Sequence, residues 1–485
     1  MKKTSRIPEL DGFRVILVFL VSWFHIWQQS WWTPYIGHTS LDFLVRSGYI
    51  HVDGTILLSG FLLFLPWARA RRDGGLLPDT REFYQKRVCR IVPSYWFIIT
   101  VVLFVVALPF GLYGSPQFMV QDLFTHYTFT FTMDRATYIQ SPLGASYWTL
   151  AIELQMYLIF PFVARAAVKK PGAVLTMMTA AAWAWRGWCA WALHDYNMVL
   201  NQVPAFLDVY ALGMALAMVY VKLEAAELDR KERILITCAS TALLALCLWM
   251  IPTLLRHQAA AGDHVLIQRG QMIRRAPFAL MLGGILIALP FTIRPIRWLM
   301  GNRVMTFLSS ISMNYYLIHQ TLCVHLRRLG IPASVSDMPN QAGEVPWKYQ
   351  YTFLSFGLSV LAAVLVTYLV EKPAGKALQK WFNSRVCGVP VHQLKKLAED
   401  ARISSGDRVM LVGTDVPAQV MARAARLMKE AGCTVQVVMK DTRAELACGN
   451  TAQPAGIAVM KEQQGGRMVQ AAALATGTKS AAKKE

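Results

Sequence analysis

The chain has 485 residues, of which 55% are hydrophobic and only 16% charged, and its mean hydropathy is +0.35. A soluble protein of this length carries more charge, so these values exclude an ordinary soluble globular protein. The formal net charge of +20 gathers between apolar blocks and in the C-terminal tail, which is typical of membrane topology and argues against a nucleic-acid partner. The eight cysteines show no C-x-x-C pair and no metal-ligand spacing, so we expect neither a disulfide framework nor a metal site.

The first apolar block lies in ELDGFRVILVFLVSWFHIWQQSWW (Glu9–Trp32) and is expected to stay in the mature protein as a membrane span. Basic residues precede it, as in a signal peptide. Against cleavage stand the acidic Glu9 and Asp11, the ionisable Arg14 and His25, and the lack of a small-x-small site.

Ten apolar blocks in all have about the length of a membrane-crossing helix. They cover residues 13–31, 48–68, 91–112, 147–167, 173–193, 203–222, 234–255, 276–293, 304–325 and 350–370. The arginine-rich segment 68–90 places the second loop, and with it the N-terminus, in the cytoplasm. Ten spans return the C-terminus there, so we expect a multi-pass protein of the cytoplasmic (inner) membrane. The arginines of segment 256–275 depart from this rule, because they would lie outside.

The composition changes after the last span. Residues 390–450 predict a strand, an amphipathic helix and a second strand, without the G-x-G-x-x-G that would seat a dinucleotide. Residues 451–485 are rich in Ala, Gly, Gln and Lys and are expected to be disordered. The predicted fold class is therefore an all-α polytopic membrane domain of about ten transmembrane helices (residues 1–375) with a small C-terminal cytoplasmic α/β (βαβ) appendage.

Two ionisable residues mark the first span. Arg14 and His25 are eleven residues apart, which returns them to one helix face about 16 Å apart along the axis. Asp11 precedes Arg14 by one turn and is expected to pair with it. An ionisable group within a span usually faces the protein interior or a water-filled path. The alternatives are that Arg14 reaches the lipid headgroups and that His25 bonds a neighbouring helix.

Polar residues also mark the third and fourth spans. Arg87 and Arg90 share a face just before the third span, and two guanidiniums there suit a polyphosphate ligand. The alternative is ordinary positive-inside charge. Glu153 lies near the middle of the fourth span with Tyr157 one turn on, and its alternative interpretation is an ion pair with Arg186.

The ninth span contains FLSSISMNYYLIHQ, in which Ser312, Tyr316 and His319 fall on one face. We expect this polar stripe to point into the bundle as part of a substrate site. Interhelical hydrogen bonding is the alternative.

Taken in order, six stretches resemble the membrane-bound acyltransferase 3 family. They are ELDGFRVILVFLVSWFH, VDGTILLSGFLL, FYQKRVCRIVPSYW, SYWTLAIELQMYLIFP, ISMNYYLIH and VEKPAG. The second departs from the family's VDLFFVLSGF-like run. The resemblance implies an enzyme, an O-acyltransferase that moves an acyl group, usually acetyl, from cytoplasmic acyl-CoA to a hydroxyl of a glycan, lipid-linked sugar or similar acceptor. The family's functional residues map onto Arg14, His25, Arg87, Arg90 and Glu153.

Acyl transfer needs a base near the attacking hydroxyl and a holder for the thioester. In our hypothesis His25 is the base, Glu153 orients it, and the three arginines bind the phosphates of the donor acetyl-CoA. No permanently bound cofactor is expected. The alternative is a transporter or flippase that uses the buried ionisable residues as a proton relay. The acceptor, the acyl length, an acyl-enzyme step and the oligomeric state stay open, and segment 113–146 is where we expect acceptor contacts, or else an amphipathic segment on the membrane.

Overall fold

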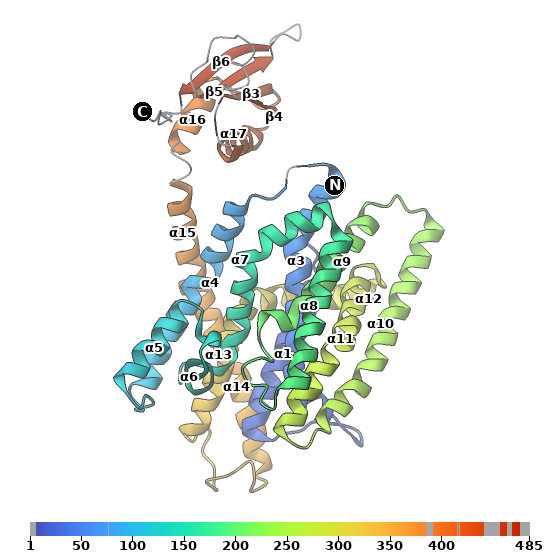
Figure 1. Ribbon diagram of the computed structural model, residues 1–485, viewed down its shortest axis with the longest axis vertical. Helices are drawn as coiled ribbons and strands as arrows, with labels where there is room; N and C mark the ends of the chain where they lie inside the picture. Colours follow the sequence, from blue (N-terminus) through green and yellow to red (C-terminus); the bar gives the residue numbers. More distant parts are fainter. Residues whose placement is uncertain are drawn as a thin grey trace. The chain divides into compact units, whose positions relative to one another are not determined.

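The computed structural model describes residues 6–75, 77–384, 391–414, 416, 418–440, 456–462 and 468–475. The chain divides into two compact units, Met1–Pro373 and Ala374–Glu485. The first unit is a bundle of long helices, and the second contains a small sheet with helices (Figure 1). The sequence predicts a domain boundary near residue 375, and this division lies two residues before it.

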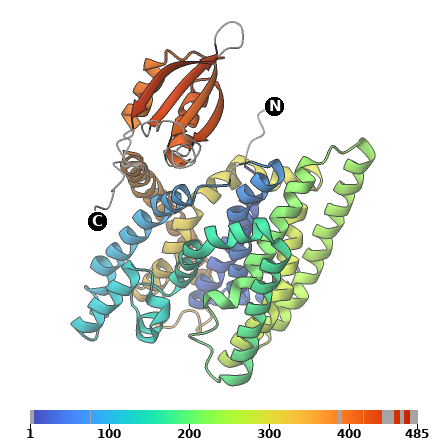
Figure 2. The same cartoon turned by 45° about the horizontal axis from the view of Figure 1, so that its top comes forward.

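The long helices of the first unit lie side by side (Figures 1 and 2). They are α1 (Glu9–Ser30), α3 (Val52–Asp73), α4 (Thr80–Val102), α7 (Trp148–Lys169), α8 (Pro171–Ala192), α9 (Leu207–Ala225), α10 (Arg230–Ala259), α11 (His264–Ala288), α13 (Arg303–Arg328) and α14 (Val345–Val366). The shorter elements are α2 (Asp42–Arg46), α5 (Pro116–Tyr127), α6 (Arg135–Gln140), α12 (Arg294–Gly301), and the paired strands β1 (Tyr35–Ile36) and β2 (Thr39–Ser40). Several helices have a flanking turn of tighter or wider helix, among them η1 (Gly48–His51).

Each of the ten predicted spans contains a helix, but by length and composition eight segments of the described chain could cross a membrane. They are Glu9–Ser30, Gly48–Asp73, Thr80–Ala107, Trp148–Lys169, Val203–Ala225, Arg230–Ala259, His264–Phe291 and Val345–Phe382. Helices α8 and α13 are also long, at 22 and 26 residues, but they are not among these eight segments. The number ten therefore stays a prediction.

The basic segment that departed from the topology rule is mostly helix. Helix α11 begins at His264, well before the predicted span at 276, so Arg269, Arg274 and Arg275 lie within it. Arg275 is 1% exposed and forms an ion pair with Asp53. Arg275 therefore departs from the positive-inside pattern because its counter-charge lies inside the bundle.

Glycines allow α3 and α9 to approach closely. A Cβ added to Gly60 would lie 2.7 Å from the Tyr210 carbonyl oxygen, and one added to Gly213 would lie 2.7 Å from the Phe61 nitrogen. Small residues at such crossings are typical of helices packed in membranes. The glycines therefore hold α3, the helix that carries Ser59, close against α9.

The second unit begins within α15 (Lys372–Ser384). It also contains α16 (Val391–Asp400), β3 (Arg408–Thr414), α17 (Ala418–Glu430), β4 (Thr434–Lys440), β5 (Gly456–Glu462) and β6 (Met468–Ala475). The strands form a sheet in the order β4-β3-β5-β6. Strands β3 and β4 are parallel with α17 between them in sequence, so the predicted βαβ unit is confirmed. The other pairings are antiparallel.

The expected disorder of residues 451–485 is wrong for 456–462 and 468–475, which are β5 and β6. Ile457 and Val459 of β5 are 1% and 0% exposed in a core with Val409 and Leu411 of β3. The stretch GIAVMKE alternates between residues that point into the core and residues that point away from it. The Ala and Gly residues on either side of it made the segment resemble a disordered tail. The remaining residues of this tail lie outside the described residues.

Candidate functional site

A cavity of about 250 Å³ lies within the first unit. Helices α1, α3, α4, α7 and α13 contribute its walls, and it collects six of the eight predicted site residues: Arg14, Arg87, Arg90, Glu153, Ser312 and Tyr316. These residues come from four helices that are far apart in the sequence. The apolar remainder includes Val18, Leu58, Leu62, Leu63, Ile91, Leu150, Met313 and Leu317.

Three guanidiniums face this cavity without a carboxylate partner. Among the described residues, none of Arg14, Arg87 and Arg90 forms an ion pair within 4.0 Å. The Arg87 guanidinium lies 5.5 Å from the ring centres of Phe83 and Tyr157, a cation–π arrangement that leaves its N–H groups available. Unpaired arginines in one cavity form a site for an anion, because guanidiniums bind phosphate and carboxylate through two parallel bonds.

Asp11 does not pair with Arg14, contrary to the sequence prediction. Its carboxylate accepts from Arg6 at 2.7 Å and from the Thr306 hydroxyl at 3.1 Å. Since Thr306 belongs to α13, the tertiary contact replaces the local pair expected within one turn of α1. Arg14 therefore lines the cavity without an ion pair to Asp11.

Glu153 is the carboxylate of this cavity. Ser59 donates to its Oε1 at 2.8 Å and Tyr157 donates to its Oε2 at 3.1 Å. The alternative ion pair with Arg186 is not formed, because Arg186 holds Asp208 in a two-armed pair, with Nη1 2.9 Å from Oδ1. Two hydroxyl donors hold this carboxylate in a fixed orientation while further lone pairs remain open to the cavity.

A second cavity of about 420 Å³ adjoins the first. Its lining comprises Arg6, Ile7, Leu10, Asp11, Arg14, Leu62, Leu65, Arg90, Ser309 and Ser310. Arg14, Leu62 and Arg90 line both cavities. The first cavity contains Glu153, the second extends to Arg6 and Ile7 just before α1, and two arginines border both.

His25 and His319 lie outside both cavity linings but next to one another. Their ring centres are 5.3 Å apart. His25 is half-buried, and its Nδ1 lies 3.1 Å from Gln28 Oε1. His319 is fully buried and borders Tyr316, which does line the first cavity, at 5.4 Å between ring centres. The structure thus brings the two histidines together, and it does not bring Glu153 into hydrogen-bond contact with His25.

Sequence reasoning missed the hydroxyl groups that complete the cavity and a second charge cluster beside it. Thr55, Ser59 and Thr149 line the cavity. Their only signal was a polar residue within an apolar span. The charge cluster consists of the pairs Asp53–Arg275 and Arg186–Asp208, and both arginines donate to the Ala205 carbonyl oxygen, at 3.3 and 3.0 Å.

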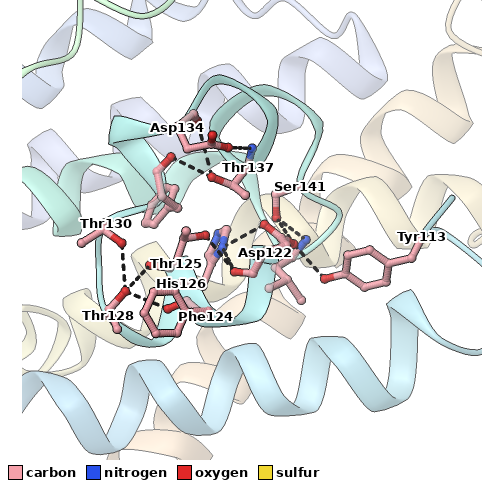
Figure 3. A network of polar contacts seen from close by, with 12 residues as sticks. Tyr113, Asp122, Phe124, Thr125, His126, Thr128, Thr130, Asp134, Thr137 and Ser141 are labelled. Atoms are coloured by element: carbon pink, nitrogen blue, oxygen red, sulfur yellow. Dashed lines mark hydrogen bonds and ion pairs between the residues drawn. The ribbon is translucent and has the colours of Figure 1, made fainter. Parts of the chain in front are cut away.

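The segment of residues 113–146 folds around a buried carboxylate (Figure 3). Asp122 accepts from Tyr113 and from Ser141, both at 2.8 Å, and lies 3.1 Å from His126. His126 stacks on Phe131 at 4.1 Å. Burial, together with the neighbouring Asp122 carboxylate, raises the pKa of Tyr113 well above its ordinary value. The hydroxyls of Tyr113 and Ser141 thus form hydrogen bonds within the segment. The expectation that the segment contacts the acceptor stays a prediction.

Comparisons with known proteins show the family of this chain. A family model described as an acyltransferase domain, that of acyltransferase family 3, matches residues 7–372. The chain is 26% identical over 182 residues to the peptidoglycan O-acetyltransferase OatA of Listeria monocytogenes, covering 33% of this chain and 25% of that protein. It is 28% identical over 171 residues to the O-acetyltransferase OatA of Staphylococcus aureus, covering 32% and 24%. The chain thus spans about a quarter of the length of these relatives. No solved structure matches.

Proposed function

Because the chain belongs to the acyltransferase 3 family and is a multi-pass membrane protein, we propose that it is an O-acetyltransferase that uses acetyl-CoA as donor. The acceptor in this proposal is a hydroxyl of a glycan or lipid-linked sugar of the cell envelope. The names of the two relatives, O-acetyltransferases of which one acts on peptidoglycan, support this acceptor class. We propose the cytoplasmic membrane as the location, with both termini in the cytoplasm, as the arginine-rich segment 68–90 favours.

The observation that carries the proposal is the cavity with three unpaired arginines. Arg14 and Arg90 stand where the two cavities meet, and Arg87 stands one helical turn from Arg90. CoA carries several phosphates, which guanidiniums bind well. A neutral sugar alone would give no reason to keep three uncompensated guanidiniums within a membrane domain, where each is costly.

His25 is the proposed general base. It lies about 16 Å along α1 from Arg14, at 1.5 Å per residue, and the flexible thiol arm of CoA would cover that distance. Neutral imidazole accepts a proton near pH 7, so it can deprotonate the attacking hydroxyl. The tyrosine and serine of the polar stripe, Tyr316 and Ser312, line the cavity and are proposed to contact the donor or the acceptor.

Glu153 has a different proposed role from the one expected from sequence. Its carboxylate bonds Ser59 and Tyr157 and lies among the arginines of the cavity. We propose that it fixes these donors and the arginine side chains around the bound thioester. It would then shape the donor site, and the orientation of His25 would depend on other residues.

The test is binding of labelled acetyl-CoA to the purified full chain in detergent. The variant pair Arg87→Ala and Arg90→Ala should each weaken binding about tenfold or more, the effect of losing one charged hydrogen-bonded contact. Arg71→Ala is the matched control, since Arg71 belongs to the same basic region but lines neither cavity. A transporter or flippase would not bind acetyl-CoA, so an absence of binding by the unmodified chain would favour that alternative. Base-labile acetate in the envelope glycan of producing cells would identify the product.

A further inference from the structure

His319 of α13 has a buried ring nitrogen without a partner. Its side chain is 0% exposed, and its Nδ1 lies 2.7 Å from the carbonyl oxygen of Tyr316. A carbonyl oxygen only accepts hydrogen bonds, so the neutral ring carries its hydrogen on Nδ1. Its Nε2 is then a lone-pair acceptor, and this atom is buried with no hydrogen bond. A buried acceptor of this kind is costly unless a donor reaches it.

The packing of α13 on α1 holds the His319 ring in place. The ring stacks on Tyr315, with centres 5.9 Å apart and planes 10° apart, and the Tyr316 ring borders it at 5.4 Å. The Tyr315 hydroxyl is hydrogen-bonded to Ser22 of α1 at 2.8 Å. This bond joins the two helices at the level of the histidines, so the direction of Nε2 is set by the packing.

The ring of His25 is a neighbour of His319 that could supply a donor to that lone pair. The two ring centres are 5.3 Å apart with planes tilted by 45°. Gln28 Oε1 accepts from Nδ1 of His25 at 3.1 Å, which leaves Nε2 of neutral His25 as a lone pair too. Two lone pairs make no bond to each other. Once His25 gains a proton, its Nε2–H becomes the donor that His319 lacks, and rotation about the soft χ2 torsion can direct it there.

Protonated His25 needs such a partner. In Ser-His-Asp enzymes a carboxylate stabilises the imidazolium. Here the Glu153 carboxylate bonds Ser59 and Tyr157, and the ring contacts of His25 are with Phe24 and His319. An imidazolium in such surroundings is costly unless its N–H is hydrogen-bonded.

We propose that His319 is a positioning residue whose Nε2 accepts a hydrogen bond from the imidazolium form of His25 during acetyl transfer; this inference rests on the proposed function. In that step the O–H bond of the acceptor breaks, its proton moves to His25, and its oxygen bonds the acetyl carbon. The C–S bond breaks, its electron pair goes to the CoA sulfur, and His25 returns the proton to that sulfur. His319 stabilises the charged ring between the two proton movements and is unchanged at the end.

The test compares two replacements of His319 of similar reach. His319→Met removes the acceptor and suits an apolar interior, whereas His319→Gln offers an amide oxygen near the position of Nε2. His51→Met and His51→Gln are the matched controls. His51 is 3% exposed, and its Nδ1 lies 2.9 Å from a carbonyl oxygen three residues earlier, but its ring packs on Phe278 instead of a histidine.

The assay measures thiol release from acetyl-CoA by the purified full chain in detergent, with de-acetylated envelope glycan of the producing cells as acceptor probe. We expect H319M to lower turnover by about 10- to 150-fold, the effect of losing one hydrogen bond to a charged group, with an unchanged KM for acetyl-CoA. H319Q should turn over several-fold faster than H319M, and both His51 variants should stay within about twofold of the wild type, as variants away from the reacting groups do.

Wild-type turnover in H319M, or equal losses in H319M and H319Q, would overturn the inference while leaving the proposed function intact. If H319M fails to bind acetyl-CoA, His319→Asn decides, because it can keep a donor toward the Tyr316 carbonyl and removes only the second acceptor. Unchanged turnover in H319N would then refute the role. A wild-type chain that binds acetyl-CoA but never transfers the acetyl group would overturn the proposed function and this inference together.

Discussion

Asp53 of α3 and Arg275 of α11 form a buried ion pair whose disruption should be costly. Arg275 Nε lies 3.2 Å from Asp53 Oδ1, and the two side chains are 0% and 1% exposed. Asp53→Ala would leave the guanidinium over the Phe206 ring, 3.8 Å from its centre, without its ion-pair partner. Removing one partner of a buried pair costs roughly 3–5 kcal/mol, since the remaining charge stays desolvated.

The double variant Asp53→Leu with Arg275→Leu should recover most of that loss. Replacing a buried ion pair by apolar residues is often neutral or stabilising. The Ala205 carbonyl, to which Arg275 donates, keeps its bond from Arg186 at 3.0 Å. The assay is the temperature at which the full chain in detergent loses its monodisperse elution on size exclusion. The reasoning would be refuted if D53A lost its monodisperse elution only at the wild-type temperature, or if the double variant lost it at a lower temperature than D53A.

Three further predictions follow from other parts of the structure. Glu153→Gln keeps an acceptor for Ser59 or Tyr157 but removes the charge. It should lower acetyl transfer by about 100-fold, the scale of one preorganised electrostatic contact, with little change in thermal stability. A variant that loses both acetyl transfer and thermal stability would contradict the site assignment. Gly213→Leu should prevent α3 and α9 from packing and abolish monodisperse protein, whereas Gly172→Leu, at a glycine with open space, should not. Lys461 lowers the pKa of Asp407 below its ordinary value, so this contact stabilises the second unit fully above about pH 4 and less as the pH falls further. Asp407→Asn should remove this acid sensitivity, which is measured by hydrogen exchange of β3. An unchanged acid sensitivity of the variant would contradict the prediction.

The convergence of the cavity residues could be predicted because it depends on helix periodicity. Arg87 and Arg90 are three residues apart and Ser312 and Tyr316 are four apart, and residues so spaced share a helix face wherever the helix packs. Since a polar face within a membrane points inward, the six lining residues met in one cavity. That much follows from the sequence alone.

The choice of partners could not be predicted, because it depends on how helices are placed around one another. Asp11 had Arg14 one turn away, but α13 brought Thr306 to it and the chain before α1 brought Arg6. Glu153 and Arg186 belong to consecutive helices, yet Arg186 reaches Asp208 of α9. Strand β5 could not be predicted for a related reason. Its two inward residues are buried only because the strand pairs with β3, which is distant in the sequence.

The buried charges of the membrane unit fall into two sets that bear on the choice between enzyme and transporter. Asp53 and Asp208 each form an ion pair with an arginine, and both arginines donate to the Ala205 carbonyl, so these acids are fixed in place and suit a structural role. A proton relay needs acids that gain and lose protons as the protein moves. The other set is the arginines of the cavity with Glu153, in which positive charge exceeds negative and the balance is open to a ligand. An excess of fixed positive charge cannot pass a proton along, whereas it can hold the phosphates of a donor, and this asymmetry favours acyl transfer over transport.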